Sequence, residues 1–149
     1  MEKAPTGPLK GLRVLDLTRV LAGPTCTQML GDMGAEVIKI ERPGSGDDTR
    51  GFAPPLWPNT QESAYFLGVN RNKKSLTLDI AAPEGQEIIH RLLETCDILV
   101  ENFKVGALAK YGLGFEQLKA KHPGLIYCSI TGFGQTGPYA PRPGYDALI

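Results

Sequence analysis

Arg42 is the residue whose type and position point most directly to a ligand. It follows Val37, Ile38 and Ile40, whose pattern predicts a strand that closes at Glu41. In parallel α/β sheets the ligand lies beyond the carboxyl ends of the strands, where the residue that ends the second strand commonly meets the ribose or its phosphate. An arginine there suggests a phosphorylated ribose, although an arbitrary arginine at a strand end more often simply faces solvent.

The first expected strand spans residues 12–17, and the turn that follows it argues against an ordinary dinucleotide site. Ala22, Gly23 and Pro24 open a helix, with proline in the first turn, where its missing N–H costs nothing. Only one glycine of the G-x-G-x-x-G pattern is present, so an NAD-dependent oxidoreductase is the least favoured function. A ligand with an adenosine phosphate and a different pyrophosphate cradle fits better, and coenzyme A is the common one.

Other reactive side chains have simpler explanations. Asp47 and Asp48 look like a catalytic pair, but adjacent aspartates after Gly-Ser-Gly more often cap a turn or helix. Arg71, Lys73 and Lys74 would suit phosphates, yet a basic run beside a strand is more often a solvated edge or an interface. The glycine-rich segment TGFGQTGP would suit an anion-binding nest, or a loop near the active site.

The three cysteines indicate an intracellular protein. Cys26, Cys96 and Cys128 are far apart and set among apolar residues, which favours buried, reduced thiols and no metal or redox site. A helix N-terminus could lower the pKa of Cys26 and make it nucleophilic. Neither His90 nor His122 lies in a recognisable partner motif, so a structural role is favoured.

Charge and hydrophobicity exclude some partners. Sixteen basic and sixteen acidic residues cancel, so no global field would attract nucleic acid or an anionic membrane. The hydrophobic content of 42% is typical of a globular chain. Neither a transmembrane span nor a signal peptide is indicated.

The rest of the chain alternates between strand and helix patterns. The expected elements are strands at 75–80, 98–100 and 125–130 and helices at 83–95, 105–111 and 115–121. Ile88, Ile89, Leu92 and Leu93 recur at helical spacing and should form a buried face. The alternation predicts an α/β fold, a Rossmann-like, mostly parallel sheet with helices on both faces.

The predicted domain organisation is simple. We expect residues 1–11 to be an N-terminal extension. Residues 12–149 should form one CoA-binding domain that is truncated at its C-terminal end, because the apolar, uncapped ending looks like the start of a new helix.

Several segments in a fixed order resemble the class III CoA-transferases, the group of formyl-CoA transferase and carnitine CoA-transferase. The segments are LDLTRVLAGP, LGDMGAEVIKIERPGSGDDTR, NRNKKSLTLDI, VENF, YCSITGFGQTGP and the final GYD. The resemblance covers nearly the whole chain from Leu9 onward, and the order and spacing of these segments are highly specific. NRNKKS, YCSITGFGQTGP and GYD look most like the succinyl-CoA:glutarate (hydroxymethylglutarate) CoA-transferases.

The resemblance implies transfer of CoA from an acyl-CoA, such as succinyl-CoA, to a carboxylic acid, in particular a dicarboxylic acid. In this family an aspartate attacks the thioester, and an acyl-aspartyl anhydride leads to an aspartyl-CoA thioester. That aspartate is expected beyond Ile149 and is not Asp146, so this chain alone is expected to be inactive. CoA is then a substrate, and no tightly bound cofactor or metal is expected. The full-length protein is expected to be an interlocked homodimer, and the chain alone to associate.

The resemblance also implies CoA contacts where this sequence matches the family. The implied CoA-binding residues are Leu21 and Ala22 in the first turn, Arg42 at the adenosine phosphate, Leu78, Asp79, Ile80 and Ala81 along the adenine, Asn102, Phe103 and Lys104 after the fourth strand, and Lys110, Arg142 and Tyr145 farther on. Leu21 supports only a backbone contact. Lys110 stands where close relatives carry arginine, which keeps the charge but loses the bidentate fork.

Two other functions stay open at this point. The α-methylacyl-CoA racemases share the fold and the CoA site but use acid/base residues in place of a nucleophile, and NRNKKS and GYD favour the transferase. The second alternative is a non-catalytic fragment or isoform that binds a nucleotide or a partner chain. The expected location is the mitochondrial matrix in a eukaryote and the cytoplasm otherwise.

Overall fold

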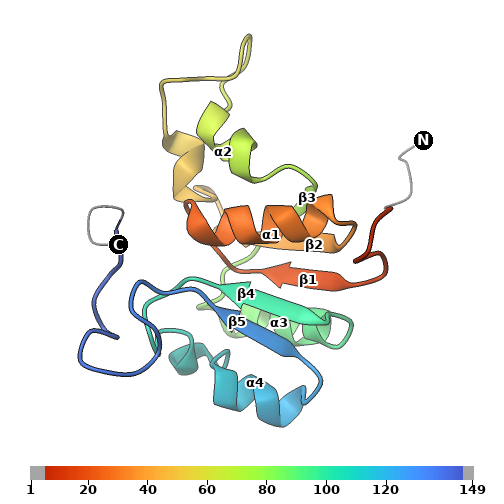
Figure 1. Cartoon of the computed structure of the whole chain (residues 1–149), viewed down its shortest axis with the longest axis vertical. Helices are drawn as coiled ribbons and strands as arrows, with labels where there is room; N and C mark the ends of the chain where they lie inside the picture. Colours follow the sequence, from red (N-terminus) through yellow and green to blue (C-terminus); the bar gives the residue numbers. More distant parts are fainter. Residues whose placement is uncertain (1–5, 146–149) are drawn as a thin grey trace.

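Short apolar runs of the sequence become five parallel strands. The computed structural model describes residues 6–145, in which the strands are β1 (Arg13–Asp16), β2 (Glu36–Glu41), β3 (Lys73–Thr77), β4 (Ile98–Glu101) and β5 (Ile126–Ser129). They pair in the order β3-β2-β1-β4-β5, and every neighbouring pair is parallel (Figure 1). The prediction of an α/β fold with a parallel sheet is confirmed.

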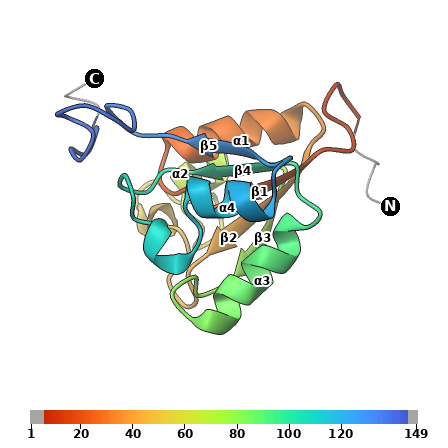
Figure 2. The same ribbon diagram turned by 90° about the horizontal axis from the view of Figure 1, so that it is seen from below.

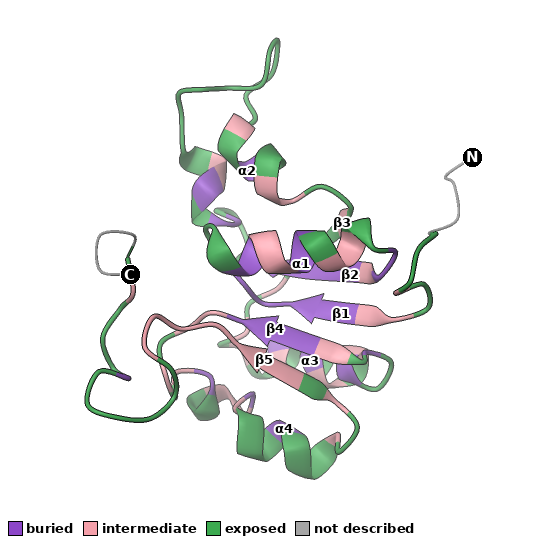
Figure 3. Cartoon of the chain, viewed as in Figure 1, coloured by how far each residue is buried: buried purple, intermediate pink, exposed green. Residues whose placement is uncertain are grey.

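Helices connect the strands and cover both faces of the sheet. They are α1 (Ala22–Asp32), α2 (Ala64–Val69), α3 (Pro83–Leu93) and α4 (Phe115–Lys121), with 3-10 turns η1 (Asp48–Gly51) and η2 (Ala109–Tyr111). Figure 2 shows α1 on one face and α3 and α4 on the other. The inner strands β1 and β4 are therefore buried along most of their length (Figure 3). No helix within residues 6–145 is long and apolar enough to cross a bilayer.

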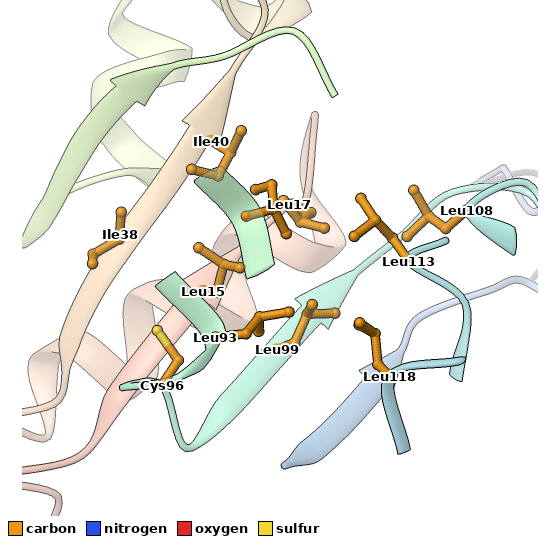
Figure 4. Close-up of a cluster of buried hydrophobic side chains, with 11 residues drawn as sticks. Leu15, Leu17, Ile38, Ile40, Leu93, Cys96, Leu99, Leu108, Leu113 and Leu118 are labelled. Atoms are coloured by element: carbon orange, nitrogen blue, oxygen red, sulfur yellow. The ribbon is translucent and has the colours of Figure 1, made fainter. Parts of the chain in front are cut away.

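The larger hydrophobic core lies between the sheet and the α3–α4 layer. Leu15 of β1 and Ile38 of β2 pack there with Ile89 and Leu93 of α3, and Leu118 of α4 belongs to the same cluster (Figure 4). None of these five side chains is more than 8% exposed. A smaller cluster on the opposite face packs under α1. The two clusters fix the sheet and leave its carboxyl edge for other tasks.

The third strand lies earlier than the sequence pattern predicts. It spans residues 73–77 instead of 75–80, because it pairs with β2 only as far as Thr77 opposite Glu41, where β2 ends. Leu78 still donates its N–H to the Glu41 carbonyl at 2.8 Å. Residues 78–81, called the 78–81 loop below, therefore leave the sheet at its carboxyl edge.

Two helix predictions were partly wrong. In α3, Ile89 and Leu93 are buried as expected, but Ile88 is 37% exposed. Neighbouring helix residues point roughly 100° apart, and Ile88 lies off the side of α3 that buries Ile89 and Leu93. The expected helix at 105–111 is reduced to η2, and Gly106 takes a left-handed φ of 75° just before it.

Gly85 determines how closely α3 approaches the 78–81 loop. A Cβ atom at Gly85 would stand 1.9 Å from the carbonyl oxygen of Asp79. We expect Gly85→Ala to lower the free energy of unfolding by about 1–3 kcal/mol, because backbone must shift to relieve the clash. Gly68→Ala is the matched control, since Gly68 is also helical and a Cβ there meets nothing within 4 Å. Urea denaturation of both variants is the test, and equal stability of the two would contradict the prediction.

Candidate functional site

A cavity of about 240 Å³ opens at the carboxyl edge of the sheet. It lies beyond the ends of β1 and β2, between the 78–81 loop, Phe103 and η2. Much of its lining is apolar, with Leu17, Ile40 and Tyr111 as further members. Its position agrees with the general placement of ligands in parallel α/β sheets.

The cavity brings together predicted site residues from distant parts of the chain. Those that line it are Arg42, Leu78, Asp79, Ile80, Ala81, Phe103 and Lys110. They come from the end of β2, the loop after β3, the end of β4 and η2. Their convergence makes this cavity the candidate site.

The other predicted contacts lie outside the cavity lining. Leu21 and Ala22 sit exposed at the start of α1, and Lys104 is exposed after β4. Arg142 stacks on the ring of Tyr139 at 4.4 Å, and Tyr145 is 68% exposed. Asn102, just after β4, is also absent from the lining. Asp146 of the GYD motif lies outside the described residues.

Asn102 fastens the turn between β1 and α1. Its Oδ1 accepts the backbone N–H of Arg19 at 2.9 Å, and its Nδ2 donates to the Arg19 carbonyl at 2.7 Å. The next residue, Val20, has a φ of 70°, which is rare for a β-branched residue. Its N–H donates to Asp47 Oδ1 at 3.3 Å. The turn is therefore held from β4 and from the loop after β2.

A buried ion pair supports the same turn. Lys39 Nζ lies 2.9 Å from Asp47 Oδ2 and donates to the Thr18 carbonyl at 2.8 Å, and the two charged side chains are 1% and 0% exposed. Asp47 also caps η1 by accepting the N–H and the hydroxyl of Thr49. Burial by itself would raise the pKa of Asp47, but the Thr49 hydrogen bonds and Lys39 lower it overall. The prediction that Asp47 caps a turn is confirmed.

Lys73 contradicts the expectation of a solvated basic run. Its side chain is 2% exposed, and its Nζ lies 3.1 Å from Asp16 Oδ2 and donates to the Pro24 carbonyl at 2.9 Å. Burial lowers the pKa of Lys73, while the charge of Asp16 opposes that shift. Arg71 and Lys74 do lie on the surface, where they pair with acidic side chains.

Two guanidinium groups meet one carboxylate at the cavity. Arg42 Nη2 lies 2.5 Å from Asp48 Oδ1, and Arg19 Nη1 lies 3.6 Å from Asp48 Oδ2. The Arg19 guanidinium also stands over the Phe103 ring at 4.9 Å. Both arginines line the cavity, so the β1–α1 turn and the end of β2 each contribute a cation to it.

Glu41 anchors the loop that carries both aspartates. It accepts hydrogen bonds from Arg50, from the hydroxyl of Ser75 and from the backbone N–H of Asp47, at 2.6–2.9 Å. Burial alone would raise the pKa of Glu41. These hydrogen bonds, Arg50 first, outweigh burial and lower the pKa to about 2.

The cysteines are free and unactivated. Cys96 is buried as expected, whereas Cys26 and Cys128 are half-buried. Burial raises the pKa of Cys26, and Cys128 and Asp16 raise it further. The raised pKa argues against a thiol activated by the start of α1.

Sequence reasoning missed Arg19 and Lys39 as lining residues of the cavity, and Asp48 as the partner of its two arginines. Lys39 left a usable signal, because a lysine within the otherwise apolar run of Val37 and Ile40 must find a buried anion. Arg19 and Asp48 left none, since their meeting depends on the path of two loops.

The arrangement suits binding of an amphipathic anion. An aromatic or aliphatic group would fit the apolar lining, and a multiply charged group would fit the two arginines. Within residues 6–145, no cluster of three or more His, Cys, Asp or Glu could hold a metal ion.

Comparison with known proteins places the chain in one family. Residues 9–149 match the model of "CoA-transferase family III". The chain is 59% identical over 141 residues to the succinyl-CoA:glutarate CoA-transferase of Mus musculus, a match that covers 95% of this chain and 32% of that protein. It is 53% identical over 146 residues to the succinate–glutarate CoA-transferase of Agrobacterium fabrum, a match that covers 95% of this chain and 36% of that protein. A CAIB/BAIF family protein from Brucella suis has a similar structure, with a TM-score of 0.90 and 53% identity over 96% of this chain and 38% of that one. The chain thus spans about a third of the length of these curated relatives.

The lowered pKa of Glu41 predicts acid sensitivity. A carboxyl group whose pKa falls from 4.5 to about 2 on folding stabilises the fold above pH 4.5, and this contribution is lost as the pH falls toward 2. It is worth on the order of 3 kcal/mol. We expect Glu41→Gln to be less stable at pH 7 and to lose less stability between pH 5 and pH 2 than the original chain. Urea denaturation at several pH values measures both, with exposed Glu116→Gln as the control, and parallel pH profiles of Glu41→Gln and the original chain would contradict the assignment.

Proposed function

Because this chain belongs to CoA-transferase family III, we propose that it forms the CoA-binding part of an enzyme that moves CoA from an acyl-CoA to a carboxylic acid. The observation that carries the proposal is the cavity where Arg42 meets the 78–81 loop and Phe103. One relative is named succinyl-CoA:glutarate CoA-transferase and another succinate–glutarate CoA-transferase. Their names support succinyl-CoA as donor and a dicarboxylic acid as acceptor.

The cavity supports distinct roles for its parts. Arg42 supplies a charged fork at a strand end, which suits the ribose phosphate of CoA. The 78–81 loop offers backbone groups and the side chains of Leu78 and Ile80 for the adenine, and Phe103 adds an aromatic face. Lys110 of η2 adds a further cation to the lining, for the more distant phosphates.

We assign the covalent step to an aspartate outside these residues. Its carboxylate would attack the acyl-CoA thioester and release the CoA thiolate, which then attacks the aspartyl carbonyl of the resulting anhydride and releases the donor acid. The acceptor carboxylate then attacks the aspartyl-CoA thioester, and the same steps in reverse order form the new acyl-CoA and free the aspartate. The residues described here would contribute binding and orientation, which keep the thiolate from diffusing away between steps.

The assembly and location belong to the same proposal. We propose that the protein acts as a homodimer, whose interlocked chains complete the site. The three free thiols support a reducing compartment, either the mitochondrial matrix of a eukaryote or the cytoplasm.

The reaction can be tested directly. The complete protein encoded by the reading frame that contains these residues is expected to form glutaryl-CoA from succinyl-CoA and glutarate, whereas residues 1–149 alone are expected to form none, because they lack the nucleophile. Mass spectrometry of the CoA esters separates the outcomes. Epimerisation of a 2-methylacyl-CoA without glutaryl-CoA formation would establish an isomerase instead. Glutaryl-CoA formation by residues 1–149 alone would refute the assignment of the nucleophile.

The role of Arg42 predicts a ligand-specific loss. Arg42→Ala should weaken binding of CoA roughly tenfold or more, since a charge-assisted hydrogen bond is worth about 1.5–3 kcal/mol, and should leave dephospho-CoA nearly unaffected. Calorimetric titration with both ligands measures the ratio. Arg91→Ala is the control, because Arg91 is an exposed arginine that does not line the cavity. Equal losses for both ligands would mean that Arg42 acts through the fold.

A further inference from the structure

Arg19, Arg42 and Asp48 form one charged cluster whose parts come from different loops. Arg42 follows β2, Arg19 lies in the β1–α1 turn, and Asp48 opens η1. The carboxylate of Asp48 uses one oxygen for each guanidinium, with Oδ1 at 2.5 Å from Arg42 and Oδ2 at 3.6 Å from Arg19. A single anion with two or more oxygens is thus the group that this pair of arginines accepts.

Arg19 has capacity for a further acceptor. Its Nε is buried and has no hydrogen-bond partner, although the residue lines the cavity. Its guanidinium is oriented by stacking on Phe103 at 4.9 Å. The two hydrogen bonds from Asn102 hold only its backbone, so they would survive a change of its side chain. An acceptor atom of a ligand in the cavity would satisfy this donor.

Asp48 is accessible enough to give way. Its side chain is 42% exposed, and the side chains of Arg42 and Arg19 are 53% and 36% exposed. Exposed ion pairs of this kind are weak, at about 0.2–1 kcal/mol. The buried Lys39–Asp47 pair next to it, by contrast, fixes the backbone of the loop. Rotation of the Asp48 side chain alone would therefore release both arginines.

We propose that Asp48 is an internal stand-in for the ligand's phosphate monoester and that Arg19 is a second residue that binds this phosphate, a proposal that rests on the proposed CoA site. A phosphate monoester carries close to two negative charges at neutral pH and three acceptor oxygens, so it outcompetes a carboxylate for two guanidinium groups. When the ligand leaves, Asp48 neutralises the arginines again. Asp48 thereby lowers the affinity for CoA and speeds its release.

The test compares Asp48→Asn and Arg19→Gln in the purified complete protein. Asp48→Asn keeps the shape and removes the charge, and we expect it to bind CoA roughly two- to fivefold more tightly, with dephospho-CoA unchanged. Arg19→Gln should weaken CoA binding and reduce the gain from Asp48→Asn in the double variant. Glu116→Gln is the matched control, because it removes one negative charge at an exposed residue of α4 that does not line the cavity. Calorimetry gives the affinities, and stopped-flow displacement gives the release rate, which should fall in Asp48→Asn.

The outcomes separate the two proposals. CoA binding that is unchanged or weakened in Asp48→Asn would overturn the stand-in role and leave the CoA site intact. Equal losses of CoA and dephospho-CoA in Arg19→Gln would overturn the phosphate contact of Arg19. If the original protein bound neither ligand, the proposed function itself would fail, and this inference with it. Thermal unfolding of each variant shows that the fold is retained.

Discussion

Two buried lysines impose the constraint on which the carboxyl edge of the sheet, with its cavity, depends. Lys39 and Lys73 have almost no solvent contact, and a buried ammonium group is tolerated only with an anion and hydrogen-bond acceptors around it. Asp47 and Asp16 supply the anions, from the loop after β2 and from the end of β1. Neither charge is satisfied until these segments come together. The carboxyl edge of the sheet is therefore organised by charge, whereas the layers behind it are organised by apolar packing.

This organisation explains how the loops at the carboxyl ends of the strands form a defined cavity. Each lysine also binds backbone carbonyls of the β1–α1 region, Thr18 for Lys39 and Pro24 for Lys73. Asn102 adds its two bonds to Arg19 from the end of β4. Strand order places β1 between β2 and β4, so the turn after β1 is within reach of both neighbours. The topology and the polar network thus support the same cavity.

The sequence predicted what depends on local pattern. Apolar runs located the strands, and the position of Arg42 after one of them identified the edge at which the cavity opens. The pattern failed where a neighbour decides the outcome, as in β3, which ends where β2 ends, and at Ile88, which faces away from the core. The basic run favours a surface position for Lys73, whereas its burial follows from Asp16, which lies far away in the sequence. The meeting of Arg19 with Asp48 has the same origin.

The left-handed backbone of Val20 sets stability against function. A β-branched residue at a φ of 70° costs on the order of 1–3 kcal/mol, and it persists because Asn102 and Asp47 hold its neighbours and its N–H. Glycine would adopt this conformation without strain, but it would also allow the turn many others. Selection for stability alone would thus favour glycine here, whereas selection for a rigid turn at the cavity would favour the branched side chain. At Val20, a glycine that raised the thermal stability would also make the turn beside the cavity more flexible.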